Sequence, residues 1–149
     1  MTNSRQQGFT LIELMMVVAI LGILAAISMS QYRNHVTRSQ VSRVMEETAT
    51  LKTSIETCLL DGRDASNCFI SWSVSNLIGA EATVSDPGQT GITITYPDSS
   101  IEARFGNAAS TMIKGQTLTW TRSEAGSWTC ATTVARRFTP NGCVSSGEA

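Results

Sequence analysis

The sequence has little of what an enzyme or a nucleic-acid-binding protein needs. It contains a single histidine among 149 residues, and its formal net charge is −1 with a pI near 5.8. A balanced charge of this kind provides no basic field for nucleic acid. His35 has no catalytic serine or cysteine set around it, so we interpret it as a solvated or subunit-interface residue, and the chain has no glycine-rich phosphate loop. We therefore expect no enzyme, no cofactor and no specific nucleic-acid partner.

Metal-binding spacing is also lacking. The four cysteines do not form a C-x-x-C motif, and Asp61 and Asp64 without further oxygen ligands are too few for calcium. We expect no metal site. Four cysteines behind an apolar N-terminus instead indicate an oxidising compartment and two disulfides. Four cysteines can pair in three ways, and we favour the one in which both bridges close short local loops. These are Cys58–Cys68 and Cys130–Cys143.

What the sequence does have is a long apolar run with one carboxylate inside it. Residues 9–29 contain only Thr10, Glu13 and Ser28 as clearly polar side chains. A helix of about 21 residues rises ~31 Å, close to one hydrocarbon core. An ionisable side chain in such a segment is costly and points to function. An ordinary signal peptide, cut near Ala25 or Ser28, is the alternative, but it has no use for Glu13.

The helical pattern continues beyond the apolar run. Between Ser30 and Leu59 there is neither glycine nor proline, and apolar residues recur at steps of three and four. The face comprises Val41, Val44, Thr48, Leu51, Ile55 and Leu59. We expect one helix from Phe9 to about Leu59, with an apolar half that protrudes and an amphipathic half that packs within the domain.

The stretch "GFTLIELMMVVAILGILAAIS" resembles the processing and assembly segment of type IV prepilins, most specifically over residues 8–32. The resemblance implies that a prepilin peptidase cuts between Gly8 and Phe9 and methylates the new Phe9 amine. It also implies that Glu13 meets the Phe9 amine of a neighbouring subunit in the filament. Two charges that are each costly in lipid become tolerable when they are paired. One departure from the family pattern is Ser30, which stands where most members have proline.

The second half of the chain has the residue pattern of a β-sheet. Short alternating runs at 69–74, 91–96, 100–105, 116–122 and 127–133 predict strands, separated by turns at 86–88, 97–99 and 124–126. We therefore predict an α+β pilin fold, a long helix on an antiparallel sheet of about four strands. The expected domains are a leader at 1–8, a polymerisation helix at 9–30 and a globular domain at 31–149. The residues after Cys143 are expected to form a flexible tail.

The resemblance further implies a disulfide-bounded C-terminal loop at 130–143. Arg136 and Arg137 lie in this loop, and we hypothesise that they contact surfaces, partner subunits or phage. The alternative role of the loop is only to anchor the C-terminal segment to the sheet.

The function implied by the resemblance is that of a structural subunit, a type IVa major pilin precursor. It is held in the inner membrane, passes through the assembly platform and joins a homopolymer on the cell surface. Such a fibre serves adhesion, twitching motility, DNA uptake or phage reception, with a host surface or phage as external partner. The alternatives are a minor pilin, a type II secretion pseudopilin, or a secreted binding module with a signal peptide.

Overall fold

The computed structural model describes residues 8–63, 67–68, 70, 75–79, 91–95 and 100–147. The chain divides into two compact units, one up to Asn34 and one from His35 onward. The expected strand at 69–74, apart from Ile70, and the expected turns at 86–88 and 97–99 lie outside the described residues. Asp64 lies outside them too.

Helix α1 spans Leu11–Leu60, as the sequence predicted to within two residues at its start and one at its end. Its C-terminus is closed by a Schellman motif. The backbone N–H of Gly62 donates to the Leu59 carbonyl at 3.1 Å, and that of Arg63 donates to the Cys58 carbonyl at 2.9 Å. Gly62 has φ +67°, the left-handed conformation that this motif requires and glycine adopts most readily.

The N-terminal part of α1 is apolar on all sides. Its large hydrophobic side chains from Leu11 to Met29 are exposed, and Gly22 has no neighbouring side chain. Ser28 satisfies its hydroxyl within the helix by donating to the Leu24 carbonyl at 2.8 Å. Such a bond hides a polar group inside an apolar segment, although it slightly weakens the helix.

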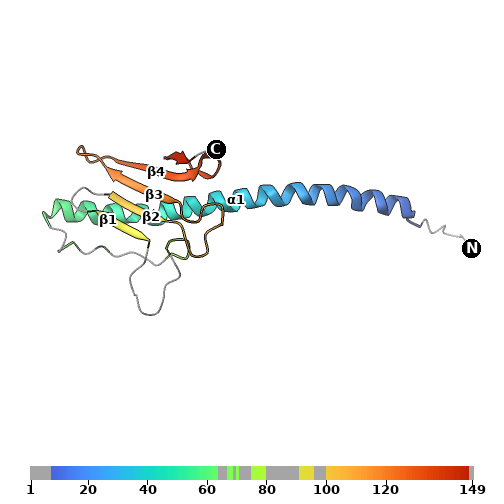
Figure 1. Ribbon diagram of the computed structural model, residues 1–149, viewed down its shortest axis with the longest axis horizontal. Helices are drawn as coiled ribbons and strands as arrows, with labels where there is room; N and C mark the ends of the chain where they lie inside the picture. The colour runs from blue at the N-terminus through green and yellow to red at the C-terminus, as the bar shows by residue number, and fades with distance from the viewer. Residues whose placement is uncertain are drawn as a thin grey trace, which may run out of the picture. The chain divides into compact units, whose positions relative to one another are not determined.

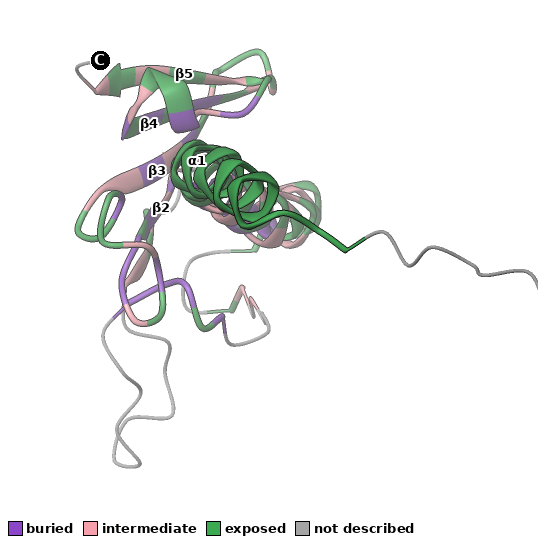
Figure 2. Ribbon diagram, turned by 90° about the vertical axis from the view of Figure 1, so that its right-hand side faces the viewer, coloured by how far each residue is buried: buried purple, intermediate pink, exposed green. Residues whose placement is uncertain are grey.

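The C-terminal part of α1 is amphipathic and packs in the globular unit. Its buried residues, spaced by three or four, are Thr37, Val41, Val44, Thr48, Leu51, Ile55 and Cys58. The predicted face is therefore confirmed, except that Leu59 is only partly buried. Figure 2 shows the transition along α1 from fully exposed turns to turns with buried positions.

A five-stranded sheet lies along this part of α1 (Figure 1). Its spatial order follows the chain order. The strands are β1 (Ile92–Thr95), β2 (Ser100–Arg104), β3 (Thr117–Arg122), β4 (Trp128–Ala135) and β5 (Cys143–Gly147). Strands β1 to β4 pair antiparallel, and four of the five predicted strands correspond to them.

The predicted antiparallel sheet of about four strands is confirmed, and β5 adds a fifth strand where a flexible tail was expected. It pairs parallel to β4, with Cys143 opposite Cys130. The 3₁₀-helix η1 (Arg136–Phe138) begins the connection that returns the chain to the same end of β4. Parallel strands usually need a crossover of a dozen or more residues. Here a shorter link suffices, with the two strands joined by a disulfide between directly opposed residues.

The core lies between α1 and the sheet. Alternate residues of the central strands face it, including Ile101 and Ala103 of β2, Leu118 and Trp120 of β3, and Val134 of β4. This alternation is the period of two expected of a sheet with one covered face. The core is completed by side chains outside the strands, namely Ile78, Phe105, Ile113 and Phe138.

Candidate functional sites on the helix and the C-terminal loop

The predicted cleavage position lies just before α1. Gly8, Phe9 and Thr10 are not helical, and the Phe9 side chain is 88% exposed. Gly8 has no atom within 4 Å of where a Cβ would lie. The Gly8–Phe9 peptide bond is therefore accessible and free of helical hydrogen bonding. Residues 1–7 of the expected leader lie outside the described residues.

Thr10 and Glu13 form a capping box at the start of α1. The Glu13 carboxylate accepts from the Thr10 backbone N–H at 3.1 Å and from the Thr10 hydroxyl at 2.9 Å. In return, the Glu13 backbone N–H donates to the Thr10 hydroxyl at 3.4 Å. This is the reciprocal T-x-x-E arrangement that satisfies donors left over at a helix start. Sequence analysis missed this role of Thr10, although the spacing is visible in "TLIE".

The capping box fixes where the Glu13 charge lies. The carboxylate points back toward the chain start, one helical turn from Phe9, and no basic group of the described residues pairs with it. Hydrogen bonds from Thr10 offset part of its cost in an apolar medium, but the negative charge stays uncompensated within the described chain. A cation from elsewhere would complete the site.

The surface that follows Glu13 is apolar as far as Met29, apart from Ser28. An 18-residue window of α1 has a mean hydropathy of 2.6, and no part of it is buried in the structure. By length and composition this is a candidate membrane span. An exposed apolar surface of this size needs lipid or other helices to cover it.

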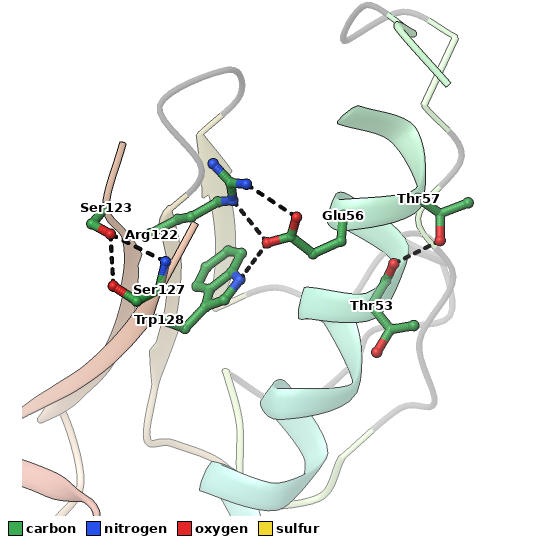
Figure 3. A network of polar contacts seen from close by, with 7 residues as sticks. All are labelled: Thr53, Glu56, Thr57, Arg122, Ser123, Ser127 and Trp128. Carbon is green, nitrogen blue, oxygen red and sulfur yellow. Dashed lines mark hydrogen bonds and ion pairs between the residues drawn. The ribbon is translucent and has the colours of Figure 1, made fainter. Parts of the chain in front are cut away.

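Polar contacts attach the packed half of α1 to the sheet at several points along its length. Near the helix end, Glu56 binds Arg122 of β3 in bidentate fashion, at 2.7 Å to Nε and 3.2 Å to Nη2. The Trp128 indole of β4 donates to the same carboxylate at 2.7 Å (Figure 3). The Arg122 and Trp128 hydrogen bonds hold the pKa of Glu56 below its ordinary value.

Closer to the start of α1 than Glu56, Trp120 of β3 makes two contacts with the helix. Its indole N–H donates to the Thr48 hydroxyl at 3.0 Å in a buried position. The Lys52 ammonium lies 3.2 Å from the centroid of the Trp120 ring, a cation–π contact. Burial there lowers the pKa of Lys52. Trp120 and Trp128 are therefore both hydrogen-bond donors to the helix.

Both predicted disulfides are present. Cys58–Cys68 joins the end of α1 to the following segment, with Cα atoms 5.6 Å apart. Cys130–Cys143 joins β4 to β5, with Cα atoms 4.5 Å apart. The described residues contain no free cysteine. The second bridge anchors the C-terminal segment to the sheet, which was the alternative role considered for it.

Arg136 and Arg137 lie in η1, inside the loop that the second disulfide bounds. Both side chains are exposed, and the Arg137 guanidinium lies 4.8 Å from the Phe138 ring centroid. Arg38 of α1, which sequence analysis did not single out, lines the same cavity as these two arginines. Because Arg38 lies about a hundred positions earlier in the chain, only the fold brings the three together.

Of the acidic pair considered for calcium, Asp61 belongs to the described residues and Asp64 does not. Asp61 is engaged by Arg63 at 3.1 Å, and no group of three potential metal ligands occurs in the parts of the chain that are described. His35 lies exposed on α1.

Comparison with known proteins places these features in context. Residues 37–144 match the family model described as pilin (bacterial filament), and residues 3–29 match the prokaryotic N-terminal methylation motif. The chain is 57% identical to a type IV major fimbrial protein FimA of Dichelobacter nodosus, over 95% of this chain and 97% of the relative. It is 40% identical to a probable minor fimbrial protein of the same organism, over 93% and 95% of the two chains. It is also 40% identical to a fimbrial protein of Pseudomonas aeruginosa, over 86% of each.

Proposed function

The chain belongs to the pilin family and is a structural subunit of a type IV pilus, and from this premise we propose how its described residues carry out processing and assembly. The methylation motif over residues 3–29 implies processing by a prepilin peptidase. We propose cleavage between Gly8 and Phe9, followed by methylation of the Phe9 amine. The exposed, non-helical Gly8–Phe9 bond supports this position.

Assembly, in this proposal, is driven by the charge of Glu13. The mature Phe9 ammonium of one subunit pairs with the Glu13 carboxylate of its neighbour. The observation that carries the proposal is a helix-start carboxylate in an apolar, exposed segment with no basic partner among the described residues. A pair of opposite charges is tolerated in lipid far better than either charge alone. The capping box keeps the Glu13 carboxylate at the helix start until the neighbour arrives.

The proposal is tested by two measurements on the protein from its native cells. The N-terminus and intact mass should show a chain that begins at methylated Phe9. Glu13→Ala should leave this processing intact and reduce surface filaments at least tenfold, because about 3–5 kcal/mol is lost when one member of a buried charge pair is removed. Thr10→Ser, which keeps the capping hydroxyl, is the matched control and should assemble normally. Wild-type filament numbers in the Glu13→Ala strain would contradict the proposed pairing.

The remaining organisation follows from the same premise. We propose a leader at 1–8, a membrane and polymerisation segment at 9–30, and a globular domain at 31–149. The precursor is held in the inner membrane by its apolar helix and is delivered to the fibre by an assembly platform. Higher identity to major than to minor fimbrial relatives, 57% against 40%, favours the major subunit.

At the level of the cell, we propose that the fibre serves adhesion and twitching motility, and that it takes part in DNA uptake or phage reception. Arg136 and Arg137 are the proposed contact residues of the globular domain, because both are exposed in the C-terminal loop. Counting filaments and measuring attachment of cells to a surface in an Arg136→Gln/Arg137→Gln strain separates contact from assembly. Normal fibres with reduced attachment support the role, and unchanged attachment contradicts it.

A further inference from the structure

We propose that the cavity beneath the C-terminal loop is a binding site for an anionic polysaccharide that carries sulfate or phosphate groups. The cavity has a volume of ≈ 800 Å³ and is lined by three arginines together with the polar loop that leads into β5. The inference deepens the proposed contact role of Arg136 and Arg137 and adds both a third residue and a ligand class.

The cavity is positively charged, which indicates an anionic ligand. Arg38 projects from α1, and Arg136 and Arg137 come from η1. None of the three makes an ion pair with a described residue, and no acidic side chain of the described chain lines the cavity. The guanidinium group presents several donors in a planar fork that matches sulfate and phosphate oxygens. Three such forks around one concave space form a site for an oxyanion.

The other lining groups indicate the kind of molecule that carries the anion. No described aromatic side chain lines the cavity, so there is no platform on which the bases of a single-stranded nucleic acid would stack. The polar groups present include the Asn141 amide and the Thr139 and Ser145 hydroxyls. Thr139 and Ser145 both donate to the Val134 carbonyl, so each hydroxyl has its proton engaged and keeps an oxygen that can accept from a ligand. Amides and fixed hydroxyls complement sugar hydroxyl groups.

Polymerisation makes a modest site effective. Exposed ion pairs are individually weak, so one subunit binds one sulfate or phosphate group loosely. A filament repeats the cavity at every subunit, and a polysaccharide repeats its charged group along its length. Linked sites of this kind bind through avidity without any additional contact.

The test measures binding of heparin, as a sulfated polysaccharide, to the full-length processed protein. Sheared filaments and detergent-solubilised subunits are compared, with double-stranded DNA as the second probe. Arg38→Gln and Arg136→Gln/Arg137→Gln should each weaken heparin binding by about tenfold or more, because charge-assisted contacts are lost. Arg104→Gln, which removes an exposed arginine of β2 outside the cavity, should remain within about twofold of wild type by the same reasoning.

A conservative variant separates geometry from charge. Arg136→Lys/Arg137→Lys keeps the net charge but loses the planar fork, so its affinity should fall between wild type and the glutamine variant. Unchanged folding, checked by circular dichroism, is required of each variant, and the lysine variant keeps the test valid where the glutamine variant does not fold.

Four results would overturn the inference, the last of which concerns its location on the filament surface. One is equal heparin binding by wild type and the cavity variants, and another is an equal loss in Arg104→Gln. The third is DNA binding that equals heparin binding and depends on the same arginines. Binding by subunits but not by filaments would overturn the surface location. Because solubilised subunits are measured separately, failure of the proposed assembly mechanism does not obscure the result.

Discussion

Glu56 holds an ion pair and an indole hydrogen bond at once, so its protonation state affects how α1 is attached to the sheet. Its pKa is lowered below the ordinary 4.5, chiefly by the Arg122 hydrogen bonds and next by Trp128. A carboxylate with a lowered folded-state pKa contributes stability above its unfolded pKa. That contribution is lost as the pH falls through the folded value.

We therefore predict that Glu56→Gln lowers the unfolding midpoint at pH 7, and that the difference from wild type shrinks as the pH falls through the folded-state pKa of Glu56. Because the pair is partly exposed, the loss at pH 7 should be about 1 kcal/mol or less. Thermal unfolding of the full chain in detergent at several pH values measures this. Glu46→Gln is the control, since Glu46 is exposed and forms no ion pair with a described residue. A pH-independent difference for Glu56→Gln would refute the linkage.

Thr48 is a second residue at which one atom, the hydroxyl oxygen, affects stability. Its buried hydroxyl donates to the Val44 carbonyl at 2.7 Å and accepts from the Trp120 indole. Thr48→Val keeps the shape but leaves the buried indole N–H without this acceptor, at a cost of about 1–3 kcal/mol. Thr48→Ser keeps the acceptor and should lose clearly less. Chemical denaturation followed by tryptophan fluorescence compares the two variants, and equal stabilities would show that the hydrogen bond contributes little.

At the scale of the element, β5 depends on its connection to β4 more than on its own sequence. Removing the second bridge in Cys130→Ser/Cys143→Ser should cost about 3 kcal/mol. It should also raise amide hydrogen exchange at 143–147 while β2 stays protected. Removing the first bridge in Cys58→Ser/Cys68→Ser should cost a similar amount but leave β5 protected. Hydrogen exchange read by mass spectrometry distinguishes the two, and unchanged exchange in β5 would show that its strand pairing holds without the disulfide.

The elements differ in how well the sequence predicted them. α1 and strands β1 to β4 have clear periods of about 3.6 and 2, so their positions followed from pattern alone. β5 was missed because its residues "CVSSG" show no apolar alternation. Its position depends on the disulfide and on two serines, Ser145 and Ser146, which donate to carbonyls of β4. Gly147 also fits because a Cβ there would clash with the Thr133 carbonyl.

The sites differ in the same way. Gly8, Phe9 and Glu13 lie in one contiguous motif, so sequence alone nominated them, and the capping role of Thr10 was readable from its spacing. The Glu56–Arg122 pair and the Arg38–Arg136–Arg137 cavity join residues that lie far apart in the chain. No local pattern encodes such contacts, because they arise only when the sheet is placed on the helix.

At the scale of the whole molecule, α1 combines a half that suits an apolar environment with a half that suits the boundary between protein core and water. The half of α1 before Asn34 presents apolar side chains on every face, whereas the half after His35 buries one stripe and exposes charges. In the proposed assembly, a sequence that changes from one pattern to the other without a break provides both the polymerisation element and the spine of a globular unit. Each subunit thus carries its interface with the fibre and its displayed domain on a single element.

The contacts between α1 and the sheet have a mechanical consequence. A fibre under tension pulls each subunit through its helix, and the sheet follows only through what attaches it. Trp120–Thr48 and Arg122–Glu56 lie at successive points along that helix, and the Cys58–Cys68 bridge holds its far end. A pull along the helix axis therefore shears several attachments together instead of peeling them one by one. Because these contacts must break together, the displayed domain keeps its register on the helix while the proposed fibre bears load.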